Sequence, residues 1–189
     1  MSQSPPSLFV AAHTLVMGIV NVTPDSFSDG GRFLDPERAI AHGRTLVAEG
    51  ADILDIGGES TRPGADAVDA EEEIRRVAPV IEALAADGKT LISIDTMKPE
   101  VAEVALSLGA RIVNDVSGLR NPEMRQVAAK RGAAVVIMHM KGTPRTMQVN
   151  PEYDDVVAEV REELARRTTE AREAGITDIC IDPGIGFGK

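Results

Sequence analysis

The sequence predicts an α/β fold, specifically a TIM-type (β/α)8 barrel of which this chain supplies about six β/α units. Two observations predict it. Helix-like stretches repeatedly end at a glycine that precedes an aliphatic strand, and nearly every strand finishes in a polar residue. Alternating strands and helices indicate a parallel sheet. Polar groups that gather at the carboxyl ends of many strands are typical of the barrel.

The first predicted strand is LVMGIVN, over 15–21, and five further strands each follow a glycine. A glycine just past a helix end takes the left-handed conformation that satisfies the last helical carbonyls. The next strand then begins within about three residues, as short helix-to-strand loops require. The five glycines are Gly50, Gly88, Gly109, Gly132 and Gly175.

Between the strands, apolar residues recur with the period of a helix. The strands are aliphatic on both sides, which indicates burial on both faces. No low-complexity linker divides the chain, so we expect a loose N-terminal tail over 1–14 and one barrel domain over 15–189. The helical stripes are clearest at Ala39, Ile40, Gly43, Leu46 and Val47, and at Val156, Val157, Val160 and Leu164.

A doubly wound sheet also fits this alternation. It would place its ligand at a single switch point and would use fewer strand ends. The first strand is not followed by a G-x-G-x-x-G segment, which weakens this alternative.

Composition narrows the class of partner. The formal net charge is −10, which argues against nucleic acid and anionic membranes as partners. No uninterrupted apolar run approaches a membrane span, and no basic residue precedes the first apolar stretch, so we expect a cytoplasmic protein. Cys180 is the only cysteine, which excludes an intrachain disulfide. An anionic substrate would need a local cation or a helix N-terminus.

The loop after the first strand reads NVTPDSFSDGG, over 21–31. Asn21, Asp25 and Asp29 offer hard oxygen ligands of the kind that suit Mg²⁺. Ser26 and Ser28 could hydrogen-bond phosphate oxygens. A solvated turn, in which the aspartates bond to their own backbone, explains the same residues.

The loop after the second strand reads GGESTRPGA, over 57–65, and contains Arg62. An arginine fork binds carboxylate or phosphate. The alternative is an ordinary surface arginine, with Glu59 and Ser60 forming a local turn.

Asp95, Asn114 and Asp182 end the third, fourth and sixth predicted strands. Carboxylates and an amide that point into one cavity can bracket a flat heterocycle rich in N–H groups, at roughly 1.5–3 kcal/mol for each charge-assisted bond. Alternatively, Asp95 caps the following helix, and Asp182 forms a turn before Pro183.

His139 ends the fifth predicted strand. It could act as a general base or lie hydrogen-bonded at the mouth of the barrel, and we favour the second. Lys141, which lies beyond the strand end, is expected to be solvated rather than to form a Schiff base.

Six segments, taken in order, resemble the dihydropteroate synthases of folate biosynthesis. The resemblance runs from about Leu15 to Lys189 and implies a (β/α)8 barrel. It also implies condensation of 6-hydroxymethyl-7,8-dihydropterin diphosphate with 4-aminobenzoate to give 7,8-dihydropteroate and pyrophosphate. The segments are NVTPDSFSDGG, GADILDIGGESTRPGA, SIDTMKPEVAEVAL, GARIVNDVSG, IMHM and IDPGIGFGK.

The resemblance also implies residue roles. Asp95, Asn114 and Asp182 would hold the pterin in a pocket lined by Met138 and Phe187. Asn21 would bind Mg²⁺, and Asp29 would help to hold the metal and order the first loop. The aminobenzoate side would be formed by Thr61, Arg62, Pro63, Phe27 and Ser28. The expected catalytic residues are Asp95, Asp182, Arg62 and Asp29.

The reaction in this family resembles a dissociative substitution. Pyrophosphate would leave first, and anionic Asp95 and Asp182 would stabilise the cationic pterin methylene. The partners would be the two small substrates, and the full-length enzyme would be a homodimer. Two alternatives stay open, a pterin-dependent methyltransferase and a catalytically silent pterin-binding relative. The loop over 21–31 argues against the methyltransferase, which has no diphosphate to bind.

The resemblance also concerns what lies beyond Lys189. A complete barrel of this class takes about 250 residues, and in the family the seventh and eighth strands supply a lysine and an Arg-x-His pair. We therefore expect this chain to lack the C-terminal part of the barrel and to be inactive and poorly folded by itself.

Overall fold

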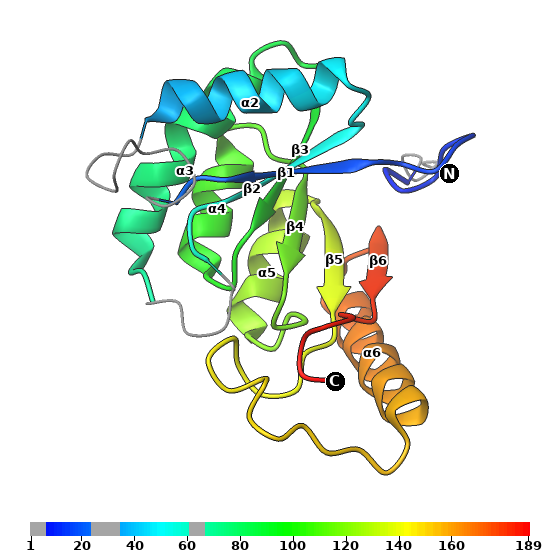
Figure 1. Ribbon diagram of the computed structural model, residues 1–189. Coiled ribbons are helices and arrows are strands. Elements are labelled where there is room, and N and C mark those ends of the chain that lie inside the picture. Colours follow the sequence, from blue (N-terminus) through cyan, green and yellow to red (C-terminus); the bar gives the residue numbers. More distant parts are fainter. Residues whose placement is uncertain (1–6, 24–34, 61–66) are drawn as a thin grey trace, which may run out of the picture.

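The computed structural model describes residues 7–23, 35–60 and 67–189. Within these residues, six strands form one parallel sheet whose spatial order follows the chain (Figure 1). The strands are β1 (Met17–Asn21), β2 (Ile53–Gly57), β3 (Leu91–Asp95), β4 (Ile112–Asp115), β5 (Ala134–Met138) and β6 (Ile179–Asp182). The helices are α2 (Pro36–Ala48), α3 (Ala70–Ala85), α4 (Pro99–Ser107), α5 (Pro122–Arg131) and α6 (Val156–Glu173).

The strand order decides between the two predicted architectures. A doubly wound sheet reverses its order at a switch point, whereas here each strand pairs with the next along the chain, from β1 to β6. The predicted alternation and parallel sheet are therefore confirmed, in the consecutive order of a (β/α) barrel. In the described part of the chain, β1 and β6 each pair on one side only, so the sheet is not closed.

Side chains with oxygen acceptors start four of the five helices described. Asp35, Asp69, Asn121 and Asp155 each accept a hydrogen bond from a backbone N–H of the first helical turn, which satisfies donors that have no partner within the helix. Helix α4 differs, because its N-cap residue is Lys98 and makes no such bond.

The structure confirms the prediction that a glycine follows the end of each helix. Each of the five glycines that were predicted to follow a helix has a positive φ, from +62° at Gly132 to +116° at Gly109. Only glycine adopts this conformation without steric cost. The chain can therefore leave each helix and enter the next strand within a few residues.

The two faces of the sheet have different environments. The outer face packs against the helices in a large aliphatic core that includes Leu54, Ile56 and Ile94, and Figure 1 shows the helices arranged around the sheet. The inner face is apolar near the amino ends of the strands, where Ile53, Ile112 and their neighbours form a smaller cluster. The polar residues of the inner face lie above this cluster, from the middle of the strands to their carboxyl ends.

The N-terminal segment lies against the amino end of β6. The Ser7 hydroxyl donates to Asp178 Oδ1 at 2.5 Å, and the Leu8 N–H donates to Asp178 Oδ2 at 2.6 Å. Leu8 and Phe9 also pack against the inner apolar cluster. Part of the predicted N-terminal tail over 1–14 thus contacts the sheet near the amino ends of its strands.

Candidate active site

Strand register places the predicted ligand residues on one face of the sheet. Asp95 on β3 is the direct partner of Asn114 on β4, and Met138 on β5 is the partner of Asp182 on β6. Asn21 on β1 joins the same row, because its partner Gly57 is paired in turn with Asp95. Paired residues of parallel strands point to the same side. The carboxyl ends of five strands thus bring these side chains to one edge.

Asp95 lies in an acidic environment. Its Oδ1 atom is buried and has no hydrogen-bond partner among the described residues. Burial raises the pKa of Asp95 well above its usual value, and the nearby carboxylates, with Asp55 and Glu73 foremost, raise it further. A ligand that brings N–H donors or positive charge would relieve both effects.

The absence of a side chain at Gly57 allows Asp95 to approach β2. A Cβ atom added at Gly57 would lie 3.4 Å from both Cβ and Oδ2 of Asp95. The Asp95 side chain therefore packs closely against the backbone of β2 at Gly57.

A hydrogen bond joins Asn114 to a carboxylate below it. Asn114 Nδ2 donates to Asp55 Oδ2 at 2.8 Å, and Asp55 is only 3% exposed. Burial raises the pKa of Asp55, and the neighbouring side chains of Ser93 and Asn114 oppose this effect only in part. Asp55 lies in the middle of β2.

The turn after β6 fixes Asp182. Its Oδ1 atom accepts a hydrogen bond from the Gly184 N–H at 2.7 Å, so the alternative role of Asp182 as a turn former also holds. Gly184 has a φ of +64°, and a Cβ atom there would lie 2.1 Å from the His139 carbonyl oxygen. The turn thus requires glycine and holds the Asp182 carboxylate at the strand end.

The predicted apolar lining gathers next to this carboxylate. Met138 is 5% exposed and lies in a cluster with Val116, Met140 and Met147, against which Phe187 packs. Methionine side chains are flexible and polarizable, and they adapt to flat rings. The cluster lies directly beside Asp182, because Met138 is its partner in the sheet.

Lys189, in the loop after β6, contacts His139, which directly follows β5. Lys189 Nζ donates to three backbone carbonyls, those of His139, Gly184 and Phe187, at 2.8–3.0 Å. His139 is buried, and its Nδ1 atom has no hydrogen-bond partner among the described residues. Burial lowers the pKa of His139, and the Lys189 charge lowers it further. A neutral imidazole is therefore favoured at this position.

Lys141 has partners of its own. Its Nζ atom lies 4.1 Å from the centroid of the Tyr153 ring and 3.6 Å from Glu159 Oε2. The ammonium group thus lies against an aromatic face and near a carboxylate.

Sequence reasoning missed a largely buried ion triad next to Asp95. Lys98 Nζ lies 2.5 Å from both Glu59 Oε2 and Glu73 Oε2, and the Glu73 side chain is 0% exposed. Glu59 Oε1 also accepts the Val68 N–H at 3.0 Å, so this carboxylate joins residues on both sides of the loop after β2. One signal was available, because Glu73 lies on the apolar stripe of α3 together with Val77.

The alternative in which Asp95 caps the following helix is wrong. Helix α4 begins at Pro99, with Lys98 as its N-cap residue, so Asp95 does not cap it. Thr96 instead accepts the Lys98 N–H through Oγ1 at 3.2 Å. The Asp95 carboxylate is thus left facing the site.

Some predicted residues lie outside the described part of the chain. Asp25, Ser26, Phe27, Ser28 and Asp29 fall within 24–34, and Thr61, Arg62 and Pro63 fall within 61–66.

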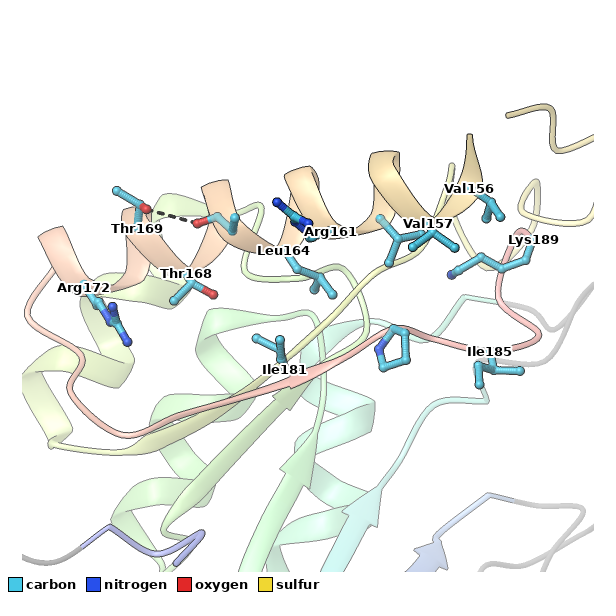
Figure 2. Close-up of a pocket in the computed structure, with 13 residues that line it drawn as sticks. Val156, Val157, Arg161, Leu164, Thr168, Thr169, Arg172, Ile181, Ile185 and Lys189 are labelled. Atoms are coloured by element: carbon cyan, nitrogen blue, oxygen red, sulfur yellow. Dashed lines mark hydrogen bonds between the residues drawn. The ribbon is translucent and has the colours of Figure 1, made fainter. Parts of the chain in front are cut away.

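The structure also contains a groove away from these residues. An open groove of about 790 Å³ runs between α6 and the strand β6 with its following loop. Figure 2 shows Leu164 of α6 on the side facing Ile181. The groove is mainly aliphatic and contains none of the predicted pterin residues, so the chemistry belongs to the polar edge described above.

Comparisons with known proteins identify the family of the chain. A family model described as "Pterin binding enzyme" matches residues 17–189. The dihydropteroate synthase of Escherichia coli is 48% identical over 180 residues, which is 94% of this chain and 64% of that protein. A probable bifunctional folylpolyglutamate synthase/dihydropteroate synthase of Haloferax volcanii is 54% identical over 178 residues, 93% of this chain and 21% of that protein.

Solved structures give the same result. The dihydropteroate synthase of Xanthomonas albilineans with 4-aminobenzoic acid is 55% identical, with a TM-score of 0.85, over 93% of this chain and 63% of that one. The same enzyme with 7,8-dihydropteroate is 51% identical, with a TM-score of 0.80, over 93% and 62%. The chain thus spans less than two thirds of the length of these relatives. Among the described helices, none combines the length and apolar character needed to cross a membrane.

Proposed function

The chain belongs to the family of pterin-binding enzymes, and we propose that it carries the pterin-binding part of a dihydropteroate synthase. One observation carries this proposal. The Oδ1 atoms of Asp95 and Asp55 are buried and have no hydrogen-bond partner among the described residues. Both residues lie beside the Asn114 amide, toward the carboxyl edge of a parallel sheet. Such an edge fits a flat, N–H-rich ring better than it fits an anion.

In the proposed site, three side chains hold the pterin. Asp95 and Asp182 accept hydrogen bonds from its N–H groups, and Asn114 contacts the same edge. Met138 and Phe187 supply the apolar surface against which the ring packs. The cluster of Met138 and its neighbours supports this division into polar and apolar contacts.

The reaction we propose is a substitution at the pterin methylene. The C–O bond to the diphosphate breaks, and its electron pair leaves on oxygen as pyrophosphate. The amine nitrogen of 4-aminobenzoate then forms the C–N bond with its lone pair and releases a proton to solvent. Asp95 and Asp182 stabilise the positive charge on the pterin in between. Their fixed positions at strand ends require no reorganisation during the reaction.

Mg²⁺ is the proposed cofactor, held by Asn21 with help from Asp29. The fit rests on donor type and place, because Asn21 offers a hard oxygen at the carboxyl end of β1, in the same row as Asp95. When bound, the ion neutralises charge on the diphosphate. Mg²⁺ commonly uses one or two protein oxygens together with substrate phosphates.

The second substrate is assigned to the two long loops. We propose that the carboxylate of 4-aminobenzoate meets Arg62, and that Arg62 and Asp29 act with the two aspartates in catalysis. The remaining proposed contacts are Thr61, Pro63, Phe27 and Ser28. A cytoplasmic location and a homodimeric full-length enzyme also stay proposals.

Calorimetry with the natural full-length polypeptide tests this function. In a synthase, pyrophosphate with Mg²⁺ should promote binding of 4-aminobenzoate, because both occupy the site after the pterin bond breaks. Enzymatic formation of 7,8-dihydropteroate is the second measurement. Pterin binding without either effect would instead support a methyltransferase or a catalytically silent relative.

Replacing Asn21 by alanine should affect metal-dependent binding without affecting pterin binding. We expect Asn21→Ala to retain pterin affinity but to weaken Mg²⁺-dependent pyrophosphate binding by about tenfold or more. The matched control is Gln126→Ala, which removes an exposed carboxamide from α5. Weakened pterin binding with intact pyrophosphate binding would show that the site is divided differently.

A further inference from the structure

Asp55 is a carboxyl group in a position where packing alone would favour an apolar residue. It lies in the middle of β2, flanked in sequence by Leu54 and Ile56, and both of these are 0% exposed. Burying a carboxyl group costs free energy unless its oxygens find partners. Only Oδ2 has one among the described side chains, since Oδ1 is buried without a partner.

Another buried aspartate provides a contrast. Asp115 on β4 is 0% exposed, and its two oxygens accept the N–H groups of Ser117 and Leu119 in its own loop. Asp115 therefore shapes a turn. Asp55 has no such local bonds among the described residues, and its hydrogen bond reaches 59 positions along the chain to Asn114.

The bond fixes which way the Asn114 amide faces. The oxygen and nitrogen of a carboxamide are nearly equal in size, so the surroundings decide the orientation. A carboxylate oxygen can only accept, and it therefore selects the amide nitrogen. Asn114 then has Oδ1 and its second Nδ2 hydrogen left, in a defined order, at the edge beside Asp95.

We propose that Asp55 is a positioning residue that locks the Asn114 amide and so sets the order of acceptor and donor that the site presents to the pterin edge. The inference rests on the proposed function, because it names pterin as the ligand. Without Asp55, the two amide orientations become similar in energy. A ligand that needs one of them then loses part of its binding free energy.

A double-mutant cycle tests this inference. Affinity for 6-hydroxymethyl-7,8-dihydropterin is measured by calorimetry on the natural full-length polypeptide. We expect Asp55→Leu to weaken binding about tenfold, the value of one net hydrogen bond, and Asp55→Asn to restore only part of it, because a carboxamide can turn either its oxygen or its nitrogen toward Asn114. In an Asn114→Ala background, Asp55→Leu should have no further effect.

The outcomes are distinct. Equal losses from Asp55→Leu with and without Asn114 would overturn the inference, because Asp55 would then act independently of the amide. Parental protein that does not bind the pterin at all would overturn the proposed function instead. If Asp55→Leu does not fold, Asp55→Ala takes its place in the cycle. Asp178→Asn is the control, since it loosens Ser7 and Leu8 at the far end of the sheet and should leave pterin affinity unchanged.

Discussion

Replacing Lys98 by methionine is expected to lower the free energy of unfolding by about 3 kcal/mol, because two buried carboxylates lose their counter-ion. The Lys98 ammonium lies 2.5 Å from oxygens of both Glu59 and Glu73, and these side chains are 14% and 0% exposed. Burial by itself lowers the pKa of Lys98, but its bonds to the two glutamates outweigh this and raise the pKa. The triad is thus a mutually dependent group of charges.

Urea unfolding of the natural full-length polypeptide measures this effect. Lys130→Met is the matched control, because Lys130 is 74% exposed and pairs with Glu103 at the surface of α5, where ion pairs contribute little. Adding Glu73→Gln to Lys98→Met should recover part of the loss, since it removes one uncompensated charge. An unchanged unfolding midpoint for Lys98→Met would show that water screens the triad.

The fold was predictable because the glycines that follow its helices are a local signal in the sequence. A glycine after each helix needs a positive φ wherever the chain turns back into the sheet, and that requirement is visible in the sequence without knowledge of distant contacts. The alternation by itself left the order of the strands open, and the structure shows that it is consecutive. The doubly wound alternative lacked its glycine motif and is excluded by the strand order.

Only those site residues that lie at the carboxyl ends of the strands were predictable from the sequence. Asp95 and Asp182 end their strands and Asn114 is the last residue but one of β4, so parallel packing alone brings them together. The hydrogen bond from Asn114 to Asp55 and the Lys98 triad depend on register between strands and on helix packing. Lys98 also occupies a cap position that sequence rules assign to a smaller polar residue. Predictions for residues within 24–34 and 61–66 lie outside the described part of the chain.

Replacing Asp182 by alanine is expected to abolish pterin binding, with a loss of affinity of about 100-fold or more. Two terms add: the charge-assisted hydrogen bond itself and the cost of leaving a ligand N–H unpaired in a closed pocket, each about 1–3 kcal/mol. The substitution also removes the acceptor for the Gly184 N–H, which lies 2.7 Å from Asp182 Oδ1. Calorimetric titration with 6-hydroxymethyl-7,8-dihydropterin measures the loss.

Asp182→Asn separates the two roles of this side chain. Its carbonyl oxygen can still accept the Gly184 N–H and hold the turn, while its amide nitrogen faces the ligand with a donor in place of an acceptor. If pterin is held by the carboxylate, Asp182→Asn should bind nearly as poorly as Asp182→Ala while unfolding like the parental protein. If Asp182 serves only the turn, Asp182→Asn should retain parental affinity, and the assignment of its carboxylate to the pterin ring would be wrong.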